Sequence, residues 1–206
     1  MRIPIASDGY RFIAAGLIIT GTTMVYNTII GGISLVITLF LVNFFRDPNR
    51  SIPSTSNAIV SPADGKITQI NDTTINNQPY KHVVIFLSVF NVHINRIPID
   101  GTVTDLNYKK GAFKAAFDPE IDKQNERMEI TMDTAIGTVK VVQIAGLLAR
   151  RIVTRLALNQ TVRKGNRFGM IKFSSRTDLY IPSSTTLHVT VGDTVKGASS
   201  IIATHQ

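Results

Sequence analysis

An uncharged stretch of 34 residues near the N-terminus, residues 12–45, restricts the possible folds more than any other feature of the sequence. A straight helix of that length would be about 51 Å long, whereas the hydrocarbon core of a bilayer is about 30 Å thick. Asn27 and the pair Gly31-Gly32 divide the stretch into two apolar arms, residues 12–26 and 28–45. The sequence therefore predicts a hairpin of two short arms that enters or crosses a membrane.

Arginines flank this stretch on both sides: Arg2 and Arg11 precede it, and Arg46 and Arg50 follow it. Because basic residues concentrate on the cytoplasmic side of membrane segments, both ends of the hairpin are expected in the cytoplasm. The protein is then expected at the cell membrane, with the rest of the chain on the cytoplasmic face. The alternative is a buried helix pair in a soluble protein, but a small domain rarely buries so long an uncharged run.

The chain after residue 50 has the pattern of a mainly β domain. Short runs rich in branched and aromatic residues, separated by Asp-Gly, Lys-Gly and Gly-Asp turns, predict strands. These runs are residues 83–90, 128–132, 138–144, 168–173, 179–181, 187–191 and 200–203. Residues 146–158 fit either a helix or a strand followed by a loop. We expect two parts: a membrane-associated segment, residues 1–50, and one mainly β (α+β) catalytic domain, residues 51–206.

The composition narrows the possible chemistry. The chain has no cysteine, which excludes disulfides, thiolate nucleophiles and cysteine-bound metals. No His, Asp and Glu cluster has metal-ligand spacing, and no Gly-rich phosphate loop is present. The net charge of +8 favours anionic partners of many kinds. Nucleic acid is not expected among them, since the sequence lacks an organised basic helix or an aromatic stacking motif.

Histidine is the most common general base near neutral pH, and few candidates exist. The four histidines are His82, His93, His188 and His205. Only His93 has polar companions nearby in sequence, Asn91 and Asn95, just after the predicted strand 83–90. In an extended chain these three side chains would share one face. His93 is therefore the preferred site candidate.

Two further features fit either a structural or a chemical role. Asp64, in the turn SPADG at residues 61–65, is expected to cap that turn, with Gly65 supplying a positive φ, or else to orient a histidine. Three serine pairs, at residues 174–175, 183–184 and 199–200, contain possible nucleophiles. The residue types alone do not choose among them.

Several segments, taken together and in order, resemble the short-form phosphatidylserine decarboxylases. The segments are FFRDP at 44–48, SPADG at 61–65, FNVHINRIP at 90–98, GAF at 111–113, NER at 125–127, QIAG at 143–146, ARRIV at 149–153 and RFGMIKFSSR at 167–176. The resemblance implies an enzyme that makes phosphatidylethanolamine and CO2 from phosphatidylserine in an anionic membrane. A decarboxylase of a related serine lipid, such as archaetidylserine, would carry the same motifs.

The resemblance also implies a covalent pyruvoyl cofactor made from Ser175, with no external cofactor. The Ser175 hydroxyl attacks the carbonyl of Ser174, and β-elimination and hydrolysis then leave the pyruvoyl group, which forms a Schiff base with the substrate. The chain is cut between residues 174 and 175, and its two products, the second of 32 residues, form a heterodimer. The family has glycine where this chain has Ser174, and glycine holds a strained backbone at less cost.

Two other residues take roles from the same resemblance. His93 matches the family histidine near the substrate and is the expected proton donor. Asp64 lies in the matching SPADG motif and is expected to help in maturation. Longer family members carry a second histidine where this chain has Arg96, so the base that activates Ser175 stays open.

The C-terminal tail, residues 191–203, resembles a different class, the closing half of a biotinyl/lipoyl-type hammerhead barrel. On that interpretation the protein is a membrane-anchored adaptor without catalysis. A carrier is disfavoured because no lysine is flanked by methionines. The same tail predicts barrel-sandwich character for the β domain.

Overall fold

The computed structural model describes residues 4–111, 125–146, 151–172 and 175–206. The chain divides into two compact units, Met1–Asn49 and Arg50–Gln206. The first unit contains a short 3-10 helix, η1 (Ser7–Gly9), and two α-helices, α1 (Tyr10–Tyr26) and α2 (Thr28–Phe44). The second is mainly β, as the sequence predicted, and its described residues contain no α-helix.

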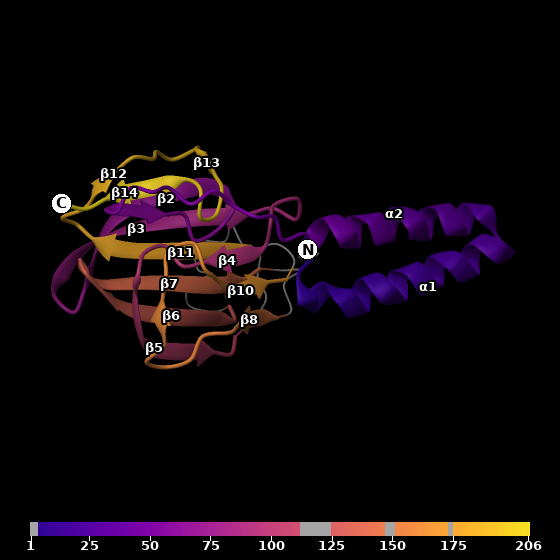
Figure 1. Ribbon diagram of the computed structural model, residues 1–206, viewed down its shortest axis with the longest axis horizontal. Coiled ribbons are helices and arrows are strands. Elements are labelled where there is room, and N and C mark those ends of the chain that lie inside the picture. The colour runs from indigo at the N-terminus through magenta and orange to yellow at the C-terminus, as the bar shows by residue number, and fades with distance from the viewer. Residues whose placement is uncertain (1–3, 112–124, 147–150, 173–174) are drawn as a thin grey trace. The chain divides into compact units, whose positions relative to one another are not determined.

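The two helices form an antiparallel hairpin that turns at Asn27 (Figure 1). The backbone of Asn27 is extended, and its side-chain oxygen accepts hydrogen bonds from the amides of Ile29 and Ile30. This side-chain cap starts α2 at the residue after the turn. The predicted division of the apolar stretch at Asn27 is confirmed.

Small and polar side chains line the contact between the helices. Thr38 hydrogen-bonds Thr20 at 3.0 Å, and Thr23 hydrogen-bonds Ser34 at 2.8 Å. Most large apolar side chains point outward instead, including Val25 and Ile29, which are 83% and 76% exposed. Within the described part of the chain, no helix combines the length and the apolar character needed to span a bilayer.

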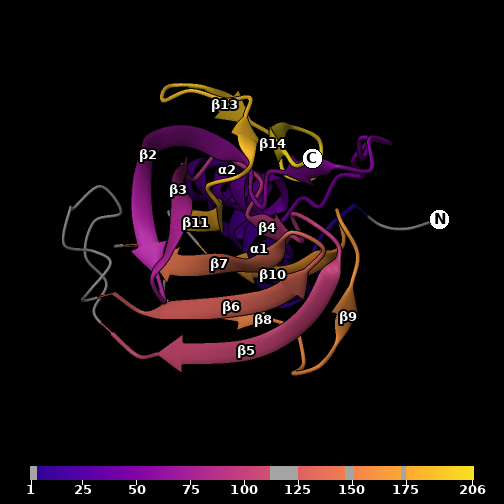
Figure 2. The ribbon, with the colours of Figure 1, turned by 90° about the vertical axis from the view of Figure 1, so that its left-hand side faces the viewer.

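The second unit is built on one eight-stranded sheet with the strand order β13-β2-β3-β11-β7-β6-β5-β9. All of its neighbouring strands are antiparallel. The sheet curls from β2 and β3 through β7 and β6 to β5 (Figure 2). Its strands are β2 (Gly65–Ile75), β3 (Gln78–Leu87), β5 (Gly101–Lys109), β6 (Arg127–Thr134), β7 (Gly137–Ala145), β9 (Thr161–Val162), β11 (Ser175–Pro182) and β13 (Thr194–Val195).

Two smaller sheets contribute side chains to the same core. One has the order β1-β14-β12, and the other β4-β10-β8. Ile59, Ile202 and Phe168 from these sheets join residues of the large sheet in one apolar cluster. The strands are β1 (Ala58–Val60), β4 (Ile94–Arg96), β8 (Ile152–Thr154), β10 (Arg167–Ile171), β12 (Thr186–Leu187) and β14 (Ile201–Thr204).

Three expectations are corrected or extended. The described part of residues 146–158 forms the short strand β8 followed by a loop, so the helical alternative is wrong there. Gly65 does not adopt a positive φ. It is needed for close approach, because a Cβ at this position would lie 2.3 Å from the carbonyl oxygen of Phe86 on β3. The strand β5 was not predicted, because its burial alternates poorly and its residues are mostly polar.

Candidate active site

Ser175 is the first residue of β11, a central strand of the large sheet. It pairs with Leu87 of β3 and with Ala145 of β7. Its side chain is fully buried, and its hydroxyl oxygen has no hydrogen-bond partner among the residues that the structure describes. A buried hydroxyl without a partner costs about 1–3 kcal/mol, so this position is unusual for a serine with only a structural role. Ser174, the other predicted cleavage-site residue, lies outside the described residues.

Thr177 lies on the same face of β11 as Ser175, because side chains alternate along a strand. Its hydroxyl accepts a hydrogen bond of 3.0 Å from the side-chain nitrogen of Asn95 on β4. The side-chain nitrogen of Gln143 on β7 donates to the side-chain oxygen of Asn95 at 2.8 Å. Asn95, Gln143 and Thr177 are all fully buried. They form a polar network inside an otherwise apolar core.

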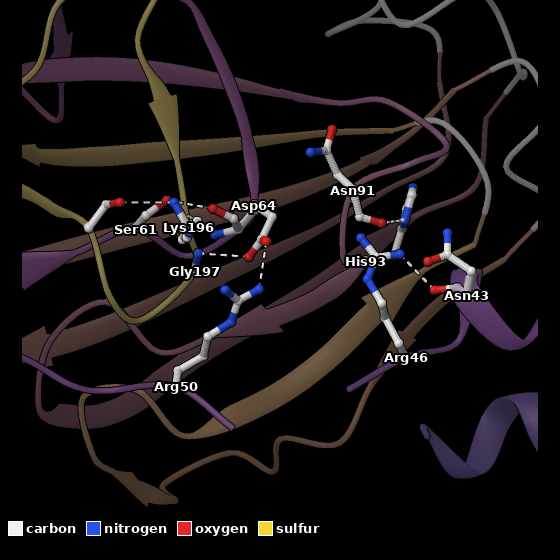
Figure 3. Close-up of polar contacts among 11 residues, drawn as sticks. Asn43, Arg46, Arg50, Ser61, Asp64, Asn91, His93, Lys196 and Gly197 are labelled. Atoms are coloured by element: carbon white, nitrogen blue, oxygen red, sulfur yellow. Dashed lines mark hydrogen bonds and ion pairs between the residues drawn. The ribbon is translucent and has the colours of Figure 1, made fainter. Parts of the chain in front are cut away.

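His93 is fully buried in the connection between β3 and β4. Its Nδ1 lies 2.9 Å from the carbonyl oxygen of Asn91 (Figure 3). A carbonyl only accepts hydrogen bonds, so Nδ1 carries a proton, and in the neutral ring the lone pair is on Nε2. This hydrogen bond fixes both the tautomer and the orientation of the ring.

The connection between β3 and β4 relates His93 to Ser175. It begins after Leu87, which pairs with Ser175, and it ends at His93, whose carbonyl accepts from the amide of Ile171. Ile171 ends β10, four residues before Ser175. The connection therefore contacts the chain on both sides of the predicted cleavage site, and it brings His93 and Ser175 to the same end of the sheet.

The predicted shared face of Asn91, His93 and Asn95 is wrong. The chain turns at residues 89–91 and becomes extended only at Ile94. The side-chain oxygen of Asn91 accepts from the amide and the hydroxyl of Ser88, which closes this turn. Asn95 instead points to Thr177 and Gln143. The alternation rule failed because it applies only to an extended backbone.

Asp64 lies apart from His93 and Ser175 in its hydrogen bonding. One carboxylate oxygen accepts from the amide of Gly197 at 2.8 Å, and the other is 2.6 Å from the guanidinium of Arg50 (Figure 3). The same turn contains Pro62, whose carbonyl accepts from the amide of Arg96 and, at 3.4 Å, from the side chain of Asn95. Asp64 thus anchors the turn that contacts the polar network.

Sequence reasoning did not assign a role to Gln143 or Thr177. Gln143 had a detectable signal, since it is a polar residue in the apolar run of residues 138–144 and within the QIAG segment. Thr177 had none, because threonine is common in strands. Arg96, which occupies the position of the second family histidine, donates to the carbonyl of Gly165. Among the described residues, no group of three or more His, Asp or Glu side chains is arranged to hold a metal ion.

Comparisons with known proteins identify the relatives of this chain. A family model described as "Phosphatidylserine decarboxylase" matches residues 37–203. The chain is 42% identical over 204 residues to the "Phosphatidylserine decarboxylase proenzyme" of Wolbachia pipientis wMel, covering 95% of this chain and 89% of that protein. It is 39% identical over 203 residues to the protein of the same name from Geotalea uraniireducens (strain Rf4), covering 97% and 95%. The Chlorobaculum tepidum protein of that name is 47% identical over 167 residues, covering 77% of each chain.

Proposed function

The chain belongs to the phosphatidylserine decarboxylase family, and from this premise we propose that it converts phosphatidylserine to phosphatidylethanolamine and CO2 with a pyruvoyl group made from its own Ser175. The relatives are named proenzymes, which agrees with activation by self-cleavage. Ser174 contributes the carbonyl that is attacked, and the cut falls between residues 174 and 175.

The observation that carries this proposal is the position of Ser175. Its hydroxyl is buried, has no partner among the described residues, and begins a strand held on both sides by β3 and β7. A hydroxyl without competing hydrogen bonds is available to attack the preceding carbonyl. The small and apolar neighbours Ala145 and Leu87 fit a group no larger than the serine from which it is made. A pyruvoyl group supplies a carbonyl that condenses with the substrate amine and takes up the electron pair released as CO2 leaves.

We assign proton transfer to His93. Because Nδ1 donates to the carbonyl of Asn91, Nε2 is the atom that takes up and delivers a proton. In this proposal His93 delivers a proton to the carbon that loses CO2. Asp64 contributes to maturation indirectly, because it holds the turn whose Pro62 carbonyl contacts Asn95.

The pairing of β11 supports a heterodimer of the two cleavage products. Every residue from Ser175 to Pro182 pairs with β3, and Ser175 to Tyr180 also pair with β7. Farther along the chain, β14 pairs with β1, and β13 pairs with β2. The 32 residues after the cut are therefore held by strands of the larger product.

The direct test is the intact mass of the purified protein, compared with a Ser175→Ala variant. We expect two chains, residues 1–174 and residues 175–206, with a keto group and no free amine at the start of the second. The Ser175→Ala protein should stay whole and release no CO2 from phosphatidylserine. An uncut wild-type chain that carries both hydroxyls and lacks activity would refute the proposal and favour a non-catalytic adaptor.

We also propose that the α1–α2 hairpin inserts its outward apolar side chains into the cytoplasmic leaflet of the cell membrane. A 17-residue helix is about 25 Å long, shorter than a hydrocarbon core of about 30 Å, which favours entry over crossing. Val25→Asp combined with Ile29→Asp, at exposed positions beside the turn, should weaken sedimentation with anionic vesicles. Leu158→Asp, an exposed position in the second unit, is the control and should leave binding unchanged.

A further inference from the structure

The polar network beside Ser175 has a defined direction. The carbonyl of Pro62 can only accept a hydrogen bond, so the group of Asn95 that faces it is the side-chain nitrogen. The side-chain oxygen of Asn95 therefore faces Gln143, which must present its own nitrogen. The hydroxyl of Thr177 accepts from the same Asn95 nitrogen. One backbone carbonyl thus sets the orientation of Asn95 and, through it, of Gln143.

Close packing holds the network in place. Gly169 of β10 pairs with Asn95 of β4, and a Cβ at Gly169 would lie 3.0 Å from the side-chain nitrogen of Gln143. The same Cβ would lie 2.2 Å from the carbonyl oxygen of Val153 on β8. Only glycine lets β10 approach both groups. The network therefore connects the β4-β10-β8 sheet to β7 and β11 of the large sheet.

Cleavage before Ser175 changes what Thr177 must do. In the uncut chain β11 continues from β10, but after the cut residue 175 is a chain terminus. Terminal residues of a strand fray unless they are tied down, and a reacting carbonyl must stay within a fraction of an ångström of its productive position. Thr177 is the third residue of the new chain, and Asn95 and Gln143 belong to the other product. Their hydrogen bonds join the two products next to the reacting residue.

We propose that Asn95, oriented by the Pro62 carbonyl and by Gln143, is a positioning residue that holds Thr177 and thereby keeps the start of β11 in register after self-cleavage. This inference rests on the proposed function, because it concerns the enzyme after its cut. Asn95 acts through Thr177 and needs no contact with substrate. Its role is to limit fraying of the terminus that carries the reactive carbonyl.

Thr177→Val tests this role, because valine keeps the shape of threonine and lacks the hydroxyl. In the cleaved protein, hydrogen exchange at the amides of residues 176–178 should become about fivefold faster, as expected for the loss of one buried hydrogen bond. The kcat should fall by about tenfold, because a displaced carbonyl reacts slowly, while KM changes by less than about twofold. Thr177→Ser retains the hydroxyl and should restore both values.

Thr185→Val is the matched control at the far end of the same strand. Thr185 is also buried, and its hydroxyl donates to the carbonyl of Pro182. The control should lower the free energy of unfolding about as much as Thr177→Val, without changing exchange at residues 176–178 or kcat. A second variant, Asn95→Asp, removes the donor to Thr177 and should reproduce the exchange and kcat effects of Thr177→Val.

Each outcome separates this inference from the proposed function. A wild-type chain that never cleaves refutes the proposed function itself. If the wild type cleaves but Thr177→Val shows unchanged exchange and unchanged kcat, only the positioning role of Asn95 fails. Equal effects of Thr177→Val and Thr185→Val on exchange and kcat, or global unfolding of Thr177→Val, would reduce the network to general stability and overturn the inference. Slower self-cleavage of a folded Thr177→Val protein, restored by Thr177→Ser, supports positioning before the cut as well.

Discussion

Individual side chains tie both faces of β11 to its neighbours. On the face that carries Thr177, the ties run to Asn95. On the opposite face, the guanidinium of Arg176 donates two hydrogen bonds of 2.6 and 2.7 Å to the carboxylate of Asp178. His82 of β3 lies 2.8 Å from the same carboxylate and stacks on Tyr180. All of these contacts lie within the first six residues after the predicted cut.

Asp178→Asn should be strongly destabilising. Asp178 is almost fully buried and accepts from both Arg176 and His82, so its replacement leaves a buried guanidinium without its bidentate carboxylate. We expect the free energy of unfolding to fall by about 3 kcal/mol in chemical denaturation. Asp193→Asn, in an exposed turn, is the control and should change it by less than about 0.5 kcal/mol. Equal effects would mean that the Arg176–Asp178 pair is not a main source of stability.

Glu129 of β6 should make the protein sensitive to acid. Partial burial acts to raise the pKa of Glu129, but hydrogen bonds from Lys140, Lys109 and Arg127 and the attraction of Lys140 outweigh it and lower the pKa from 4.5 to about 2. A carboxylate whose pKa is lowered on folding stabilises the protein above its unfolded pKa, and that stabilisation disappears as the pH falls through the folded pKa. The contribution of Glu129 should therefore be complete above about pH 4.5 and lost toward pH 2.

The measurement is the free energy of unfolding of wild type and Glu129→Gln between pH 7 and pH 2. The variant should be less stable at pH 7, and the difference between the two proteins should shrink between pH 4.5 and 2. A difference that stays constant over this range would contradict the assigned pKa.

Among the secondary-structure elements, β10 and the helical hairpin are both shaped by small residues. In β10, Gly169 allows contact with β8 and with Gln143 of β7. In the hairpin, Gly16 faces Thr38, and a Cβ there would lie 2.7 Å from its hydroxyl oxygen. Backbone contact at these positions brings polar side chains within hydrogen-bond distance. A larger residue would separate the elements and break those bonds.

Gly169→Ala should destabilise the protein by about 2 kcal/mol in chemical denaturation and slow self-cleavage. The added methyl group would lie 2.2 Å from the carbonyl oxygen of Val153, so β10 must shift away from β8 and from Gln143. Gly21→Ala in α1 makes the matched comparison, since no atom lies within 4 Å of the added Cβ. Because alanine favours helix, that control should not destabilise. Normal cleavage and stability of Gly169→Ala would refute the close-packing argument.

In the whole molecule, the large sheet is continuous across the predicted cut. The 32-residue product supplies β11 in the centre of the sheet, and β13 and β14 beside β2 and β1. Its buried side chains, such as Leu179, Ile181 and Ile202, belong to the same core as those of the larger product. Backbone hydrogen bonds and apolar burial, more than ion pairs, therefore join the two products.

The cleaved protein should behave as one particle in native buffer. Residues 1–174 and 175–206 should elute together in gel filtration, and raising the salt concentration to about 1 M should not separate them, because salt screens mainly exposed charges. Denaturant should release the short chain at the same concentration at which the fold unfolds. Release by salt alone would indicate that the products are held by surface charge.

Local sequence signals determined much of this protein. The uncharged stretch and Asn27 predicted the two helical arms, because a cap and a break act within a few residues. Runs of apolar residues located β3, β6, β7, β10 and β11, and the ordered motifs led to the family and to Ser175. The mostly polar β5 escaped prediction, since its strand conformation is imposed by pairing with β6.

Only the tertiary structure decided which distant residues meet. The placement of β11 between β3 and β7 brings Asn95, Gln143 and Thr177 together, although they are far apart in the sequence. It also gave Asp64 the partners Arg50 and Gly197, which no local pattern indicated. Strand order and side-chain networks arise from backbone pairing and packing over long sequence separations. The spacing of residues along the chain carries little information about such contacts.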